Sequence, residues 1–102
     1  RTIRDHQKLA LSSRNLLLNK NDLKIARLIS KKLIDFRKKI SKKNNIKELI
    51  SLKKAELDNL DNTKIEYLEL RNRFTLKKTL KIKNSRIFIA YFLNKIRLID
   101  NF

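Results

Sequence analysis

Apolar residues recur at helical spacing through most of the chain. Between residues 22 and 43 they follow one another at steps of three or four, which is the period of a single helix face: Ile25, Ile29, Leu33, Phe36 and Ile40. Basic residues fall mostly away from that stripe, and Asn21 or Asp22 is suited to cap its start. The pattern predicts a basic amphipathic helix that ends near Asn44 and Asn45, with a shorter and less regular helix over residues 7–18.

The helical period continues beyond this first stripe. Asn45 with Glu48, and later Thr63 with Glu66, have the spacing of a capping box at a helix start. Lys83-Asn84 interrupts the pattern, and one further apolar face follows: Ile89, Phe92, Leu93, Ile96 and Ile99. The β-branched and aromatic residues of this last segment would also suit a strand, but the 3.6-residue period favours a helix.

The predicted fold class is therefore all-α. We expect residues 46–102 to form an antiparallel helical hairpin with its turn near Asn84, preceded by a basic helical extension over residues 1–45. The two helices of the hairpin should meet through a shared set of apolar residues: Leu68, Leu76, Ile89, Phe92 and Ile96.

Composition narrows the functional classes. A chain of 102 residues forms one small domain, and it contains no Gly, Pro or Cys. Glycine-rich nucleotide loops, disulfides and zinc fingers are thereby excluded. The longest apolar run, residues 87–93, is far shorter than the roughly 20 residues that span a bilayer. Because the chain starts at Arg1 and not at Met, we expect processing or a true start further upstream, and import into an organelle is compatible with this.

Charge carries the clearest functional signal. The chain has 27 Lys and Arg against 10 Asp and Glu, a formal net charge of +17, concentrated before residue 45 and after residue 70. Neutralising phosphates releases counterions, so such a surface favours nucleic acid over a merely solvated face. A membrane-surface helix over residues 22–43 is the competing interpretation. The candidate RNA-binding residues form two clusters: Lys31, Lys32, Arg37, Lys38, Lys39, Lys42 and Lys43, then Arg71, Arg73, Lys77, Lys78, Lys81, Lys83 and Arg86.

Catalytic chemistry has little support in the sequence. His6 is the only histidine, and the carboxylate pairs Asp58 with Asp61 and Glu66 with Glu69 are typical of solvated helix starts. We therefore predict no enzyme activity, no catalytic residue, no metal and no cofactor.

Four segments between residues 46 and 99 resemble ribosomal protein twenty-nine of the large subunit. They look like the motifs that open and close the two helices of that family: Lys47-Glu48-Leu49 with Glu56-Leu57, residues 70–77 (LRNRFTLK), residues 84–87 (NSRI) and residues 94–97 (NKIR). The resemblance implies binding to large-subunit ribosomal RNA near the peptide exit tunnel, beside ribosomal protein twenty-three. Residues 1–45 would then be an extension of the kind that organellar ribosomes carry.

The sequence thus predicts a structural constituent of the ribosome that contacts RNA phosphates. Its expected partners are ribosomal RNA and neighbouring ribosomal proteins, with no small-molecule substrate and no transmembrane segment. Its expected location is an organellar ribosome, mitochondrial sooner than plastid, with the cytoplasm left open. The alternative is an all-helical interaction subunit of another assembly on an anionic membrane surface.

Overall fold

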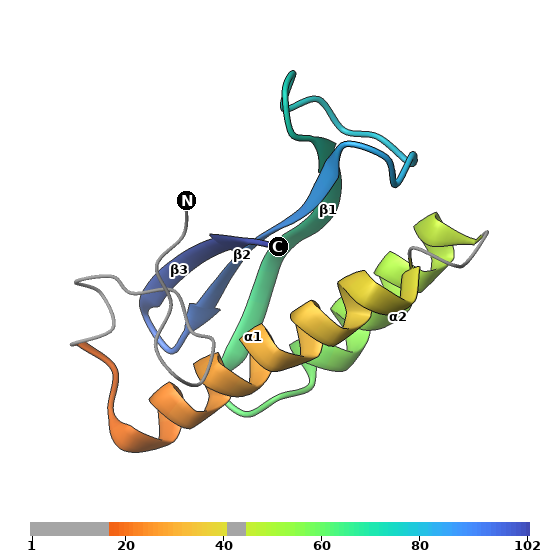
Figure 1. Cartoon of the computed structure of the whole chain (residues 1–102). Helices are drawn as coiled ribbons and strands as arrows, with labels where there is room; N and C mark the ends of the chain where they lie inside the picture. Colours follow the sequence, from red (N-terminus) through yellow and green to blue (C-terminus); the bar gives the residue numbers. More distant parts are fainter. Residues whose placement is uncertain (1–16, 41–44) are drawn as a thin grey trace.

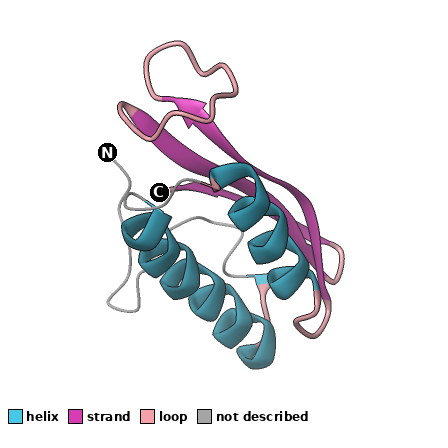
Figure 2. Ribbon diagram, turned by 90° about the vertical axis from the view of Figure 1, so that its right-hand side faces the viewer, coloured by secondary structure: helices cyan, strands magenta, loops and turns pink. Residues whose placement is uncertain are grey.

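A computed structural model describes residues 17–40 and 45–102. It contains two helices and three strands, in the order α1 (Lys20–Ile40), α2 (Ile46–Asp58), β1 (Thr63–Asn72), β2 (Ser85–Leu93) and β3 (Ile96–Asn101). The strands form one antiparallel sheet in the order β1-β2-β3, and both helices lie against the same side of it (Figures 1 and 2). No helix in these two described ranges combines the length and apolarity that crossing a membrane requires.

The helix predicted from the first stripe is confirmed as α1. Ile29, Leu33, Phe36 and Ile40 of that stripe are buried, whereas Ile25 is only partly buried. The start lies slightly earlier than expected, because the Asn19 side-chain oxygen accepts the backbone N–H of Asp22 at 2.8 Å. Residues 41–44, where the helix was expected to end, and residues 7–16 of the predicted shorter helix lie outside the described residues.

Helix α2 begins where Asn45 was expected to cap it. Asn45 occupies the N-cap position, but its side chain makes no capping hydrogen bond, so that part of the predicted capping box is wrong. Ile46, Ile50 and Leu57 are the buried positions of this helix. At its end, the carboxylate of Asp58 accepts the backbone N–H of Ile65 at 2.7 Å, which ties the helix to the first strand.

The all-α prediction is wrong, because the structure has strands from residue 63 onward. Burial in β2 alternates, with Ile87, Ile89, Tyr91 and Leu93 facing the helices, which is the two-residue period of a strand. Leu68 and Ile89, expected to meet between two helices, are instead register partners across β1 and β2. The apolar residues are so dense here that they satisfy both periods, and strand pairing decides between them.

Asparagine takes the place of glycine at three turns of this glycine-free chain. Asn62, Asn84 and Asn94 have φ values of 59°, 57° and 55°, a left-handed conformation that Asn tolerates better than most residues with a Cβ. Asn84 directly precedes β2, and Asn94 lies in the tight turn before β3. These residues allow the chain to reverse direction without glycine.

One apolar core lies between the helices and the sheet. Its fully buried members come from α1, α2 and all but the last strand: Ile29, Leu33, Ile40, Leu57, Leu70, Ile87, Ile89 and Leu93. The proposed division of the chain into residues 1–45 and 46–102 stays a prediction, and elements on both sides of that boundary contribute to this core.

Candidate functional site

Residues 73–84 connect β1 to β2 and project from the body of the molecule (Figure 1); we call this segment the arm. An open groove, which we call the α2–arm groove, runs between the arm and the first turns of α2. It consists of two adjoining hollows of about 510 Å³ and 270 Å³, which share Lys47, Ser51 and Leu80. A volume of this order is sufficient for a small molecule or a few side chains.

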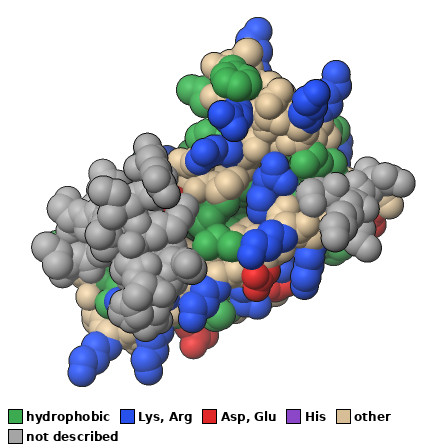
Figure 3. All heavy atoms as spheres, viewed as in Figure 1, with side chains coloured by type: hydrophobic (Ala, Val, Ile, Leu, Met, Phe, Trp, Pro, Cys, Tyr) green, Lys and Arg blue, Asp and Glu red, His purple; other side chains and the backbone are tan. Residues whose placement is uncertain are grey.

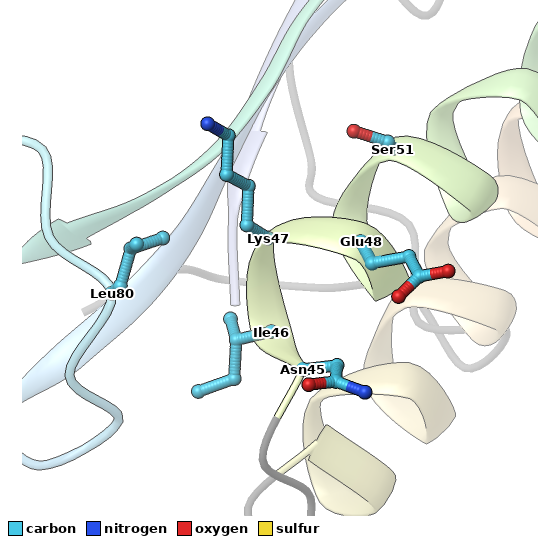
Figure 4. Close-up of a pocket in the computed structure, with 6 residues that line it drawn as sticks. All are labelled: Asn45, Ile46, Lys47, Glu48, Ser51 and Leu80. Carbon is cyan, nitrogen blue, oxygen red and sulfur yellow. The ribbon is translucent and has the colours of Figure 1, made fainter.

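The first hollow lies at the start of α2. Figure 4 shows Leu80 of the arm on the opposite side from Ile46, with the Lys47 side chain extending across toward the sheet. Asn45, Glu48 and Ser51 complete its lining. The ammonium group of Lys47 has no hydrogen-bond or ion-pair partner among the described residues.

The second hollow lies deeper along β1 and carries a compensated charge. The Glu69 carboxylate forms ion pairs with Arg71 and, at 3.2 Å, with Lys78. Burial raises the pKa of Glu69, but the hydrogen bonds from Arg71 and Lys78 outweigh it and hold the pKa below the usual 4.5. Leu68 and Leu70 line the same hollow. Its lining thus combines apolar side chains with polar ones and with one carboxylate that is paired to two cations.

Local hydrogen bonds explain why the arm has a defined shape. The side-chain oxygen of Asn72 accepts the backbone N–H groups of Phe74 and Thr75 at 2.8 Å and 3.0 Å, as in an Asx turn. Arg71 donates to the carbonyl of Leu76 at 2.9 Å. At the base of the arm, the N–H of Arg73 donates to the carbonyl of Asn84 at 2.8 Å.

The two predicted cationic clusters come from different elements, and Arg37 of the first reaches the base of the arm, which carries the second. Lys31, Lys32, Arg37, Lys38 and Lys39 are on α1, whereas Lys42 and Lys43 lie outside the described residues. The second cluster comes together on and beside the arm, with Arg71 on β1, Arg86 on β2, and Arg73, Lys77, Lys78, Lys81 and Lys83 in the arm itself. Figure 3 shows Lys and Arg side chains on the projecting arm and along the helices.

Several of these predicted cations are used inside the fold. Lys32 pairs with Glu56 at 3.0 Å, and Arg86 donates to the side chain of Asn101 at 3.1 Å. Arg37 donates to two backbone carbonyls. These three side chains have structural partners, so anion binding by the predicted clusters as a whole stays a prediction.

The other candidate groups do not form a reactive cluster. Glu66 pairs with Arg97 at 2.9 Å, and the hydrogen bond from Arg97 holds the pKa of Glu66 below its usual 4.5. Glu66 and Glu69 lie on a strand, not on the helix that their spacing had suggested. Residues 17–40 and 45–102 contain no group of three His, Cys, Asp or Glu side chains that could hold a metal ion. His6 lies outside these ranges.

Sequence reasoning missed the groove itself. Lys47, Ser51, Thr79 and Leu80, which line it, were not among the predicted site residues. The available signal was local: Asn72, Thr75 and Thr79 are turn-forming residues in the middle of the supposed helix.

Comparison with known proteins gives a consistent result. The family model described as pantoate-beta-alanine ligase matches residues 1–102. The pantothenate synthetase of Clostridioides difficile is 38% identical over 98% of this chain and 36% of its own length. That of Helicobacter pylori is also 38% identical, over 97% of this chain and 36% of its own length. The chain therefore spans about a third of the length of these relatives.

Solved structures agree with the sequence matches. A crystal structure of pantothenate synthetase from Thermus thermophilus has a TM-score of 0.83 at 26% identity, covering 99% of this chain and 37% of that one. A pantoate-beta-alanine ligase from Francisella tularensis, crystallised with beta-gamma ATP and beta-alanine, has a TM-score of 0.58 at 30% identity. It covers 99% of this chain and 30% of that one.

These matches contradict the ribosomal interpretation. The resemblance to ribosomal protein twenty-nine, the structural role in translation, and the alternative of a helical interaction subunit are wrong, because the match to a ligase family covers the whole chain. Ribosomal RNA and ribosomal proteins are accordingly withdrawn as partners, and a mitochondrial or other ribosomal location is withdrawn with them. The predictions of no enzyme and no small-molecule substrate are also contradicted, since the relatives are named as synthetases.

Proposed function

We propose that this chain, which belongs to the pantoate-beta-alanine ligase family, contributes to a pantothenate synthetase that joins pantoate to beta-alanine. The observation that carries the proposal is the family match over residues 1–102, supported by 38% identity to the Clostridioides difficile enzyme over 98% of the chain. The similar three-dimensional structure from Thermus thermophilus also supports it.

The chemistry of such a ligation explains which properties the protein needs. A carboxylate and an amine do not condense spontaneously in water, so the carboxylate must first be activated. The Francisella tularensis relative was crystallised with beta-gamma ATP and beta-alanine, and we propose a nucleoside triphosphate as the activating substrate here. Both the triphosphate and the carboxylate of pantoate are anions. A site for them gains from fixed cations that oppose the charge of the reacting phosphate.

The positive charge of this chain, first interpreted as a site for ribosomal RNA, also suits small anionic substrates. A net charge of +17 attracts small anions as well as polyanions. Exposed charges act mainly within a Debye length, about 8 Å at physiological ionic strength, so only cations near the reacting groups contribute strongly. The described residues supply an α/β unit and part of this positive charge to the proposed enzyme.

A chimeric enzyme tests the proposal directly. The matching third of the Clostridioides difficile pantothenate synthetase is replaced by this chain, and pantothenate formation from pantoate, beta-alanine and ATP is followed by mass spectrometry. We expect product only when all three substrates are present. The matched control carries Leu33→Asp, which places a carboxylate in the core and should abolish both folding and activity. A folded chimera without activity would contradict the proposal.

Growth provides a second readout. A bacterium that lacks its own pantothenate synthetase should grow without added pantothenate when it carries the chimera. The Leu33→Asp chimera should need the supplement. The isolated chain is assayed in parallel with the same three substrates, so that its own contribution is measured separately from that of the complete enzyme.

A further inference from the structure

The arm presents apolar side chains to solvent in an unusual concentration. Among the described residues, Phe74 is 69% exposed, Leu76 53% and Leu80 57%, all within seven positions of one another. The same segment carries Arg73, Lys77, Lys78, Lys81 and Lys83 and no acidic residue. Scattered exposed apolar residues need no explanation, but a cluster of them bordered by charge is typical of an interaction surface.

The arm holds these side chains in fixed positions. Leu76 has a φ of 61°, a left-handed conformation that is unfavourable for a residue with a Cβ. The hydrogen bonds from Leu76 N–H to the Asn72 carbonyl, 2.8 Å, and from Arg71 to the Leu76 carbonyl, 2.9 Å, maintain it. A surface that is already ordered loses less entropy when a partner binds.

The α2–arm groove continues this surface inward. Leu80 borders both of its hollows, with Ile46 in the first and Leu68 and Leu70 in the second. Lys47 extends across the groove and its ammonium has no partner among the described residues (Figure 4). Among the described residues, the groove therefore offers apolar walls to one or two side chains, with the ammonium group of Lys47 beside them.

We propose that the α2–arm groove docks a short acidic segment of a partner protein, in which Leu or Phe side chains are flanked by Asp or Glu. The apolar side chains enter the two hollows, and the carboxylates meet Lys47 and the lysines of the arm. Charge complementarity of this kind sets the orientation and accelerates association. This proposal goes beyond the ligase activity proposed above.

A protein segment fits the groove better than other anionic partners. Nucleic acid presents phosphates, which gain nothing from the apolar side chains of Leu68, Leu70 and Leu80. A bilayer surface suits a convex apolar face, whereas these hollows are concave. An acidic segment with apolar side chains can contact the apolar walls and also pair with the lysines.

A defined peptide serves as the probe. It has twelve residues, with two Leu among Glu residues and a fluorescent label, and its binding to the full chain is measured by anisotropy. Leu80→Glu should weaken binding at least about tenfold, equivalent to about 1.4 kcal/mol. The matched control is Leu52→Glu, because Leu52 is 61% exposed on α2 and lines neither hollow. It changes charge equally and should weaken binding much less.

A second pair of variants keeps the test valid if Leu80→Glu disturbs the arm. Lys47→Glu removes the free cation of the groove, and Lys31→Glu makes the same charge change on exposed α1. We expect the Lys47 variant to bind the peptide several-fold more weakly than the Lys31 variant. Equal losses within both pairs would overturn the proposal, because they would show attraction by net charge alone.

The remaining measurements vary the probe. A peptide with Ser in place of both Leu should bind at least several-fold more weakly, and equal binding would overturn the proposal. A twenty-base-pair RNA duplex and vesicles of phosphatidylglycerol are compared with the peptide on the wild-type chain, on Leu80→Glu and on Leu52→Glu. We expect each of them to bind Leu80→Glu and Leu52→Glu equally well, and a greater difference between these two variants than the peptide shows would assign the groove to nucleic acid or membrane instead.

Discussion

The guanidinium of Arg37 on α1 donates a hydrogen bond to the backbone carbonyl of Ser85, 48 residues further along the chain, at 3.2 Å. The same nitrogen lies 3.4 Å from the carbonyl of Ile82 in the arm. A residue that the sequence suggested as an RNA contact thus holds the base of the arm against the first helix. Its partners are backbone carbonyl groups, and because every residue has one, the sequence does not indicate which of them Arg37 contacts.

We expect Arg37→Ala to destabilise the chain by about 1–3 kcal/mol, because partly buried hydrogen bonds from a charged donor are lost. Arg37→Lys should recover only part of this, since one ammonium cannot reproduce the planar guanidinium. Lys39→Ala, at an exposed position of the same helix turn, is the control and should have little effect. Urea unfolding at neutral pH measures all three, and equal stability of the Arg37 and Lys39 variants would contradict the structure.

Asp22 and Asn94 provide a second long-range link. Only 3% of Asp22 is exposed, and the side chain of Asn94 donates to its carboxylate at 2.6 Å. Asp22→Ala should cost about 1–3 kcal/mol, because the hydrogen bond from Asn94 to this charged acceptor is lost. Asp35→Ala on the exposed part of α1 should cost much less. Thermal unfolding followed by circular dichroism distinguishes the two.

The core prediction uses two leucines of one helix. Leu33 is fully buried and Leu28 is 41% exposed, so replacing each by Ala changes helix propensity equally but burial very differently. Leu33→Ala should lower the free energy of unfolding by about 2–5 kcal/mol through lost contacts and a cavity. Leu28→Ala should lie within about 1 kcal/mol of wild type. Similar losses at both positions would mean that α1 packs through another face.

Glu56 makes stability depend on pH. Hydrogen bonds from Lys32 and then Lys53, each 3.0 Å, hold its pKa below the ordinary value of 4.5. A carboxyl whose pKa is lower in the folded chain stabilises it above the unfolded value, and this contribution is lost as the pH falls through the folded pKa. Its size is modest because the group is largely solvated.

At neutral pH, Glu56→Gln should be less stable than the wild-type chain. Below pH 4.5 its stability should fall less steeply with pH than that of the wild type. Glu48→Gln is the control, since Glu48 has no ion pair among the described residues. Urea unfolding at neutral pH and at several values below 4.5 gives the two profiles. An unchanged slope in the Glu56 variant would show that the contact with Lys32 and Lys53 does not persist in solution.

The sequence by itself determined the local features. The three-to-four-residue spacing of Ile29, Leu33, Phe36 and Ile40 was sufficient for α1, because one helix buries one face whatever covers it. The start of α2 after Asn45 and the chain reversal before Ser85 were likewise visible in the residues. The cationic excess was also readable, but charge alone does not distinguish a polyanion from a small anionic substrate.

Tertiary structure decided the rest. Residues 63–101 carry enough apolar side chains to suit a helix or a strand, and pairing of Leu68 with Ile89 in an antiparallel register selected the sheet. The groove depends on that choice, because Lys47 and Leu80 come together only when β1 and β2 form a hairpin beside α2. Strand pairing and groove formation join residues far apart in the chain, and their free energy comes from contacts that no local spacing specifies.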